Sequence, residues 1–105
     1  MTTSANPADN PSNSTIALSD VYGLARHYRF QWEEAQQCYV LLFPEGMIKL
    51  NGGAGEIIKR ADGNKTVEQI VQELEAAFPD VPDLRADVLA MLELAIDKAW
   101  LEKRN

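Results

Sequence analysis

Few side chains in this sequence are of the types that perform covalent or metal chemistry. The chain has one cysteine, Cys38, and one histidine, His27. Cys38 starts a predicted buried strand and has no histidine at a spacing typical of a nucleophile pair, so we interpret it as a packing residue. His27 has no clustered Cys, His or carboxylate ligands near it in the sequence, which argues against a metal site. We therefore expect no metal and no cofactor.

The segment Asn-Gly-Gly-Ala-Gly at 51–55 superficially resembles a phosphate-binding loop. It lacks the Gly-Lys-Ser/Thr ending of such loops, and its glycines miss the dinucleotide-binding spacing. Close backbone packing at a strand-to-helix turn is the simpler interpretation. Three acidic residues, Glu68, Glu73 and Glu75, lie on a predicted helix with a clear apolar face, so we assign them to its solvated side. No set of residues makes an active site, and we predict a binding protein, not an enzyme.

The composition indicates one small acidic domain. The chain has 105 residues and a formal net charge of −6, which disfavours binding to nucleic-acid phosphates and to anionic membranes. Residues 1–19 are rich in Ser, Thr, Asn and Pro, so we predict a disordered tail at 1–19 and one domain at 20–105. The first residues do not resemble a signal peptide, and no apolar run approaches the roughly 20 residues that span a bilayer. We expect a cytoplasmic protein.

The first half of the domain shows strand patterns. Apolar residues alternate with polar ones from Tyr28 to Trp32, and an unbroken apolar run follows at 39–43. Pro44 to Gly46 predicts a tight turn, with Gly46 supplying the positive φ that such turns often need. A short strand at 47–50 completes a three-stranded antiparallel meander with the second strand in the centre. Its last strand is an edge, and we hypothesise that this edge is where the protein works.

Three helices are predicted in the second half, which gives an α+β fold. Asn51 is a plausible N-cap for a helix at about 52–61. Thr66 and Gln69 fit a capping box for a second helix that Pro79 stops. The third helix is predicted to start with Asp83 as its cap and to continue to about Lys103.

The predicted third helix has two apolar stripes. One stripe is expected to pack on the sheet, and the other either on the second helix or on a partner protein. The first stripe consists of Leu84, Val88, Met91, Ala95 and Ala99, and the second of Leu89, Leu92, Ile96 and Trp100, with Arg85 projecting into the second.

From about Tyr28 to Leu101 the sequence resembles the PqqD family of peptide chaperones in pyrroloquinoline quinone (PQQ) biosynthesis. No single short motif is specific, but the ordered set is. The residues that match are 29–37 (RFQWEEAQQ), 39–42 (YVLL), 44–46 (PEG), 49–51 (KLN), Ala54, 56–57 (EI), 62–63 (DG) and 83–88 (DLRADV).

The resemblance implies a winged-helix-like fold of three strands and then three helices, and a role as the recognition element for a ribosomal precursor peptide. In such domains the peptide adds a strand to the third strand and packs against the third helix, which agrees with the edge-strand hypothesis. The protein would present the PQQ precursor peptide to a radical S-adenosylmethionine enzyme, which holds the iron–sulfur clusters. Carried over to this sequence, the peptide-binding residues are Gly46, Met47, Ile48, Lys49 and Leu50 on the edge, and Arg85, Val88, Leu89, Leu92 and Ile96 on the helix.

Arg85 has two interpretations, as the partner of a peptide carboxylate or as an ordinary exposed residue of a first helical turn. Two other functions also remain open. A winged-helix DNA-binding protein would need a basic surface, and the third helix offers only Arg85 near its start and a few basic residues near its end. Alternatively, the edge strand pairs with a second copy of the chain, which would make the protein a homodimer rather than a monomer.

Overall fold

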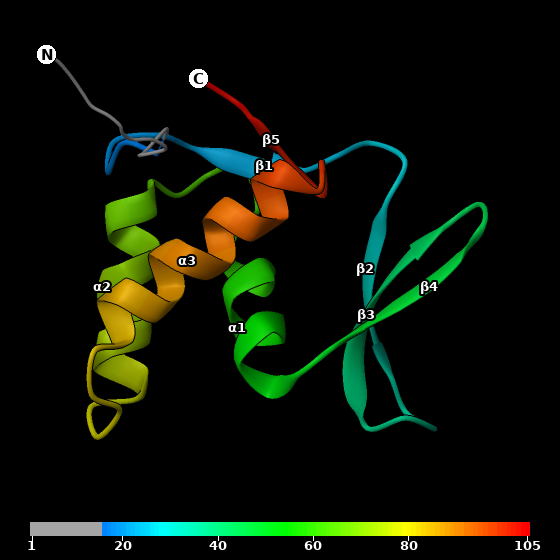
Figure 1. Cartoon of the computed structure of the whole chain (residues 1–105), viewed down its shortest axis with the longest axis horizontal. Coiled ribbons are helices and arrows are strands. Elements are labelled where there is room, and N and C mark those ends of the chain that lie inside the picture. Colours follow the sequence, from blue (N-terminus) through cyan, green and yellow to red (C-terminus); the bar gives the residue numbers. More distant parts are fainter. Residues whose placement is uncertain (1–15) are drawn as a thin grey trace, which may run out of the picture.

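The computed structural model describes residues 16–105. Its order is β1 (Tyr22–Leu24), β2 (Arg29–Glu33), β3 (Cys38–Phe43), β4 (Gly46–Leu50), α1 (Gly52–Arg60), α2 (Val67–Ala77), α3 (Leu84–Asp97) and β5 (Leu101–Lys103). The three helices form one body, and the β2–β3–β4 sheet projects from its side (Figure 1). Within the described residues, no helix is long and apolar enough to cross a membrane.

The predicted meander is confirmed. β3 is central and pairs antiparallel with β2 and β4, with Leu41 opposite both Phe30 and Ile48. Only two residues, Pro44 and Glu45, separate β3 from β4. Gly46 does not adopt the positive φ that we expected, since Gly63 is the positive-φ glycine of the described chain. Proline fixes φ near −65° and suits a turn that needs no left-handed residue.

One helix joins the sheet to the helical body. α1 packs against β3 and β4 on one side and against α2 and α3 on the other. Gly55 makes this approach possible, because a Cβ there would lie 2.8 Å from Cδ2 of Tyr39. The side chains of Leu41 and Leu50 reach from the sheet into the same core as α1, α2 and α3. The expectation that a stripe of α3 packs on the sheet is therefore wrong, since α1 takes that place.

The two helix starts predicted from local capping patterns are confirmed. The Asn51 side chain accepts a hydrogen bond from the Ala54 amide at 2.8 Å. Thr66 and Gln69 form the reciprocal capping box of α2. Asp83 is different, because it adopts a left-handed conformation (φ 55°) and its side chain makes no capping hydrogen bond. The predicted side-chain cap of α3 is therefore wrong, although the helix does begin at Leu84.

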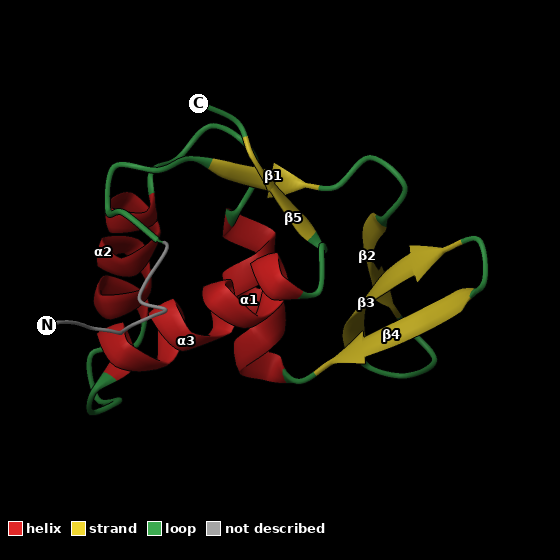
Figure 2. Ribbon diagram, turned by 45° about the horizontal axis from the view of Figure 1, so that its top comes forward, coloured by secondary structure: helices red, strands yellow, loops and turns green. Residues whose placement is uncertain are grey.

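The predicted extension of α3 to about Lys103 is also wrong. The helix ends at Asp97, and Ala99 then reverses the chain with a φ of 63° while the Trp100 amide donates to the Ala95 carbonyl. Beyond this turn, β5 pairs antiparallel with β1, so that Gly23 lies opposite Glu102. This two-stranded ribbon lies over the helices and is separate from the β2–β3–β4 sheet (Figure 2).

The chain segments on either side of the ribbon are hydrogen-bonded to each other, and the segment before β1 is also bonded to the start of α2. The amides of Val67 and Glu68 donate to the carbonyls of Asp20 and Leu18. Asn105 accepts a hydrogen bond from the Val21 amide at 3.0 Å. Of the predicted tail, residues 1–15 lie outside the described residues. Residues 16–19 belong to the segment before β1 that is hydrogen-bonded to the start of α2.

Asp20 is the buried carboxylate of this region, with 6% of its surface exposed. It accepts hydrogen bonds from the Ala17 amide at 3.0 Å and the Tyr22 hydroxyl at 3.2 Å, and Lys103 Nζ lies 3.4 Å away. The Ala17 amide, with Lys103 and Tyr22, holds the pKa of Asp20 below its ordinary value against the opposing effect of burial. Burial and the neighbouring Asp20 raise the pKa of Tyr22.

We expect the contribution of Asp20 to stability to be lost in acid. Its folded pKa lies below the unfolded value, so the charged form stabilises the fold above about pH 4 and less as the pH falls through the folded pKa. Asp20→Asn should lower the free energy of unfolding at pH 7 by about 1–3 kcal/mol, and by less near pH 3. Urea unfolding of both proteins at the two pH values tests this. An equal difference at both values would contradict it.

Ala99 offers a second test of the fold. A left-handed conformation costs an L-residue about 1–2 kcal/mol, and glycine largely avoids that cost. We expect Ala99→Gly to raise the free energy of unfolding by about 1 kcal/mol. Ala90→Gly, in the exposed middle of α3, is the control and should lower it by about 1 kcal/mol. Urea unfolding followed by circular dichroism measures both; a loss of stability in both variants would show that the turn at Ala99 is unstrained.

Candidate functional site

The side chains of the types that act as nucleophiles or metal ligands do not cluster in the described part of the chain. Cys38 is half-buried at the start of β3. His27 is exposed and its ring lies against Tyr28, with centroids 4.6 Å apart. In residues 16–105, no three His, Cys, Asp or Glu side chains come together as a metal site would require. The features that remain as a candidate site are an open strand edge and the surface beside it.

The sheet has two open edges, β2 and β4, because β3 lies between them. β4 pairs with β3 on one side and with no strand of residues 16–105 on the other, and it leads directly into α1. Its two faces differ in exposure. Leu50 is buried and Ile48 is half-buried against the core, whereas Met47 and Lys49 are exposed. Backbone groups of alternate residues point away from the partner strand in an antiparallel ladder. Because Phe43 and Gly46 flank a two-residue turn as a bonded pair, we assign the outward groups to Met47 and Lys49.

The structure alters the predicted helical wall of the groove. Val88 and Leu92 have no exposed surface and belong to the core, so they cannot contact a peptide in this conformation. Our expectation that they line a groove is wrong because α3 turns their face onto α1 and α2. A charged residue at Leu92 would disrupt folding before it affected any surface.

Arg85 shows which way the rest of that stripe faces. Its guanidinium donates to both carboxylate oxygens of Glu68, at 2.8 and 3.0 Å, and Nη2 lies 3.8 Å from Glu75. This pair holds the pKa of the Glu68 carboxyl below its ordinary value and raises the pKa of Arg85. Leu89 and Ile96 follow on the same flank and are half-buried. This flank therefore faces α2.

The opposite flank of α3 faces α1. Leu84 and Asp87 line a pocket together with the first residues of α1. Met91 and Leu94 continue this flank at helical spacing, and Leu94 is 44% exposed. The signal for this flank was present in the sequence as Leu94, an apolar residue on the otherwise polar side of α3.

The pocket has a volume of about 460 Å³ and lies where α1 begins, directly after β4. Ile57 and Leu74 are its buried members, and Phe78 and Val81, which are 40% and 44% exposed, form part of its outer wall. Two carboxylates, Glu56 and Asp87, are on its lining, and so are the glycines of the helix start. The full lining is Gly52, Gly53, Glu56, Ile57, Leu74, Phe78, Val81, Leu84 and Asp87.

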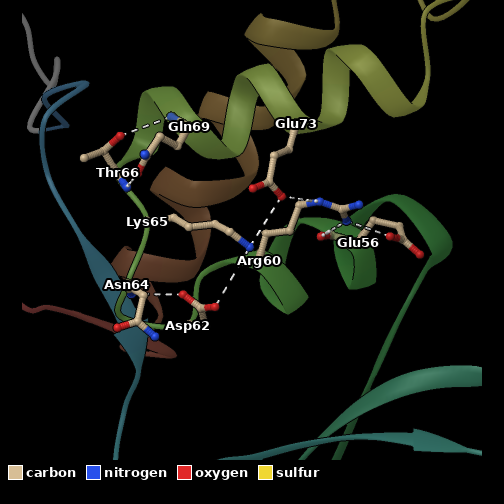
Figure 3. Close-up of polar contacts among 8 residues, drawn as sticks. All are labelled: Glu56, Arg60, Asp62, Asn64, Lys65, Thr66, Gln69 and Glu73. Carbon is tan, nitrogen blue, oxygen red and sulfur yellow. Dashed lines mark hydrogen bonds and ion pairs between the residues drawn. The ribbon is translucent and has the colours of Figure 1, made fainter.

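A polar network fixes the helices that form this pocket (Figure 3). Glu73 of α2 lies 3.4 Å from Arg60 Nε and 3.4 Å from Lys65 Nζ. Arg60 also binds Glu56 at 2.7 Å, whereas its buried Nε makes only the ion contact with Glu73 and no hydrogen bond. Each pair contributes little by itself, but together they hold the end of α1 to α2.

Comparisons with known proteins place this architecture in a group. The family model described as "Coenzyme PQQ synthesis protein D (PqqD)" matches residues 38–101. A relative named PqqA binding protein from Stutzerimonas stutzeri is 46% identical over 87% of this chain and 99% of its own length. One of the same name from Pseudomonas aeruginosa is 51% identical over 85% of this chain and 97% of its own.

A solved structure supports the same grouping. The solution structure of the PqqD truncation of Methylobacterium extorquens PqqCD has a TM-score of 0.68 and 36% identity to this chain. The similarity covers 85% of this chain and 96% of that one. That protein is described as a functional, stand-alone recognition element for a ribosomally synthesized and post-translationally modified peptide.

The contact between Arg85 and Glu68 can be tested directly. Arg85→Gln removes the positive charge that stabilises the Glu68 carboxylate, so we expect the pKa of Glu68 to rise toward its ordinary value. A pH titration of the side-chain carboxyl by NMR measures this. Arg26→Gln is the control, because it removes a positive charge from an exposed position elsewhere. It should leave the pKa of Glu68 unchanged. A Glu68 pKa that does not respond to Arg85→Gln would mean that Arg85 is available to a peptide carboxylate.

Proposed function

This chain belongs to the PqqD family, and from that membership and the open edge of β4 we propose that it is a non-catalytic peptide-recognition domain. Its ligand would be PqqA, the precursor peptide named in its relatives. The single observation that carries the proposal is the outer side of β4, which pairs with no described strand and belongs to the edge strand that leads directly into α1.

The proposed binding mode is β-strand addition. A peptide strand beside β4 would bond to the outward backbone groups of Met47 and Lys49, and main-chain bonding of this kind gives affinity without requiring a particular sequence. β4 is only five residues long, so the ladder alone offers few bonds. Side-chain contacts beyond the ladder must supply the specificity.

The helical wall that we propose for the groove differs from the sequence-based one. α1 contacts both β4 and α3. We therefore propose that β4 and α3 form the two sides of the groove, with α1 between them. The α3 flank with Leu84, Met91 and Leu94 is turned to this side, whereas Arg85 is engaged with Glu68 and Leu89 lies on the α2 side. We assign the helical wall of the groove to the flank with Leu84, Met91 and Leu94. The edge that pairs with the peptide remains Gly46 to Leu50.

Delivery of the bound peptide completes the proposal. We infer from the family that the partner is the radical S-adenosylmethionine enzyme of the PQQ pathway, which would perform the crosslinking on the presented peptide. A domain that binds the peptide backbone along a short edge leaves the rest of the peptide free to enter another active site. The occurrence of a PqqD segment within PqqCD supports the view that this domain works beside enzymes.

A proline at position 49 tests strand addition. Proline removes the outward N–H without removing a bond to β3, and edge strands tolerate it there. We expect Lys49→Pro to weaken PqqA binding at least about tenfold, since it loses one bond and obstructs its neighbours. NMR titration with synthetic PqqA measures the affinity, and the spectrum of the free variant reports its fold. The same variant should slow peptide crosslinking by the enzyme.

Lys49→Ala is the matched control, because it removes the same side chain and keeps the N–H. It should bind PqqA nearly as well as the natural sequence. Equal loss in both variants would point to the lysine side chain and against strand addition. If Lys49→Pro instead converts a dimer to a monomer in sedimentation and leaves PqqA affinity unchanged, the edge serves self-association.

A further inference from the structure

We propose that the pocket at the start of α1 is a side-chain specificity site, which takes one large apolar residue of the bound peptide just outside the strand that pairs with β4. This inference rests on the proposed function and specifies how the same site selects its peptide. Strand addition reads the backbone, whereas this pocket would read a side chain.

The position of the pocket makes it reachable from the edge. β4 ends at Leu50, and the pocket lining begins at Gly52, with only Asn51 between them. A strand rises about 3.3 Å per residue. A peptide that pairs with β4 and continues past Leu50 therefore comes to the pocket within about two residues.

The lining of the pocket suits an apolar side chain. Ile57 and Leu74 provide apolar surface that belongs to the core, and Leu84 adds the edge of α3. Phe78 and Val81 leave 40% and 44% of their surface exposed beside it. Large apolar residues that are exposed together around a concave surface are typical of a binding site.

Gly52 and Gly53 supply a second, independent observation. Neither has the positive φ that would require glycine. A Cβ at Gly52 would meet no atom within 4 Å, and one at Gly53 would meet only Oδ1 of Asn51, at an ordinary 3.6 Å. Gly55 is different, because Tyr39 fills its space. Packing thus explains one glycine of the segment, and our sequence-based interpretation is wrong for the other two.

Two glycines that neither packing nor backbone geometry requires are unfavourable in a helix, where alanine is preferred. Both lie on the lining of the pocket. Their effect on the surface is to keep the pocket open toward the end of β4. A ligand that approaches the α1 backbone closely would account for them.

The charge around the pocket indicates what flanks the apolar residue. Glu56 is paired with Arg60, whereas Asp87 is exposed on the other side, and no basic residue is among the lining residues. The chain as a whole carries a net charge of −6. The pocket should therefore favour an apolar residue with a Lys or Arg next to it and reject one with acidic neighbours.

The proposal is tested by a substitution in the pocket lining that occupies the space of the bound side chain. Gly53→Leu places an apolar side chain over the pocket and should weaken binding of synthetic PqqA by about tenfold or more, as expected when one buried apolar side chain is displaced. Ala76→Leu adds the same side chain at an exposed position of α2 outside the pocket lining and should bind normally. Calorimetry measures affinity, and NMR spectra of the free proteins confirm that both variants are folded.

Gly53→Ala is the milder variant. It should raise the midpoint of thermal unfolding, since alanine favours the helix, and still reduce PqqA affinity. A variant that is more stable and binds less well cannot be explained by a damaged fold. If Gly53→Ala and Gly53→Leu both bind PqqA as tightly as the natural sequence, the pocket assignment is overturned while strand addition stands. If the natural sequence itself does not bind PqqA, the proposed function fails as well.

Peptide variants identify the side chain that enters. Each large apolar residue of PqqA is replaced by alanine in turn, and one replacement should cost affinity with the natural protein but not with Gly53→Leu. Asp87→Asn should reduce the salt dependence of PqqA binding. Unchanged salt dependence would overturn the assignment of a basic neighbour.

Discussion

The structure depends on the close approach of α1 to the sheet. Tyr39 occupies the space where a side chain at Gly55 would stand, and its ring stacks on Phe30 with centroids 4.8 Å apart. α1 can therefore pack closely against β3, while its other side packs against α2 and α3. The apolar face of a small sheet must be covered, and α1 contributes to that cover through its contacts with β3 and β4. This contact places β4 beside the helices and thereby sets the geometry of the candidate site.

Affinity and selectivity would come from different parts of this surface. The ladder of β4 is short, exposed and open to any extended backbone, and edges of this kind invite unwanted pairing. A charged side chain on the solvent face of an edge strand, as Lys49 is here, is one of the features by which proteins limit such pairing. The pocket after β4 adds a requirement that a random strand does not meet. In the proposed binding mode, the two features together would restrict this short edge to one peptide.

The sequence was sufficient for elements that depend on neighbouring residues. The alternation at 28–32, the Asn51 cap and the Thr66–Gln69 capping box are local patterns, and each is present in the structure. The β1–β5 ribbon was missed because its strands have three residues each and lie far apart in the chain. The turn at Ala99 could not be predicted from the sequence, because glycine usually occupies a left-handed position after a helix.

The orientation of α3 required the structure for another reason. Two apolar stripes show that a helix has two neighbours, but periodicity does not say which neighbour faces which stripe. Arg85 was ambiguous until Glu68, seventeen residues away, proved to be its partner. The glycines were ambiguous in the same way, since only Tyr39 distinguishes Gly55, which packing requires, from Gly52 and Gly53, which it does not.

The ribbon also determines how this domain can be attached to other proteins. Val21 and Asn105 are hydrogen-bonded to each other, and the β3–β4 hairpin projects from a different part of the molecule (Figure 1). A partner attached beside this ribbon would be attached away from the β4 edge. Tethering raises the local concentration of a bound cargo at a neighbouring active site without tighter binding.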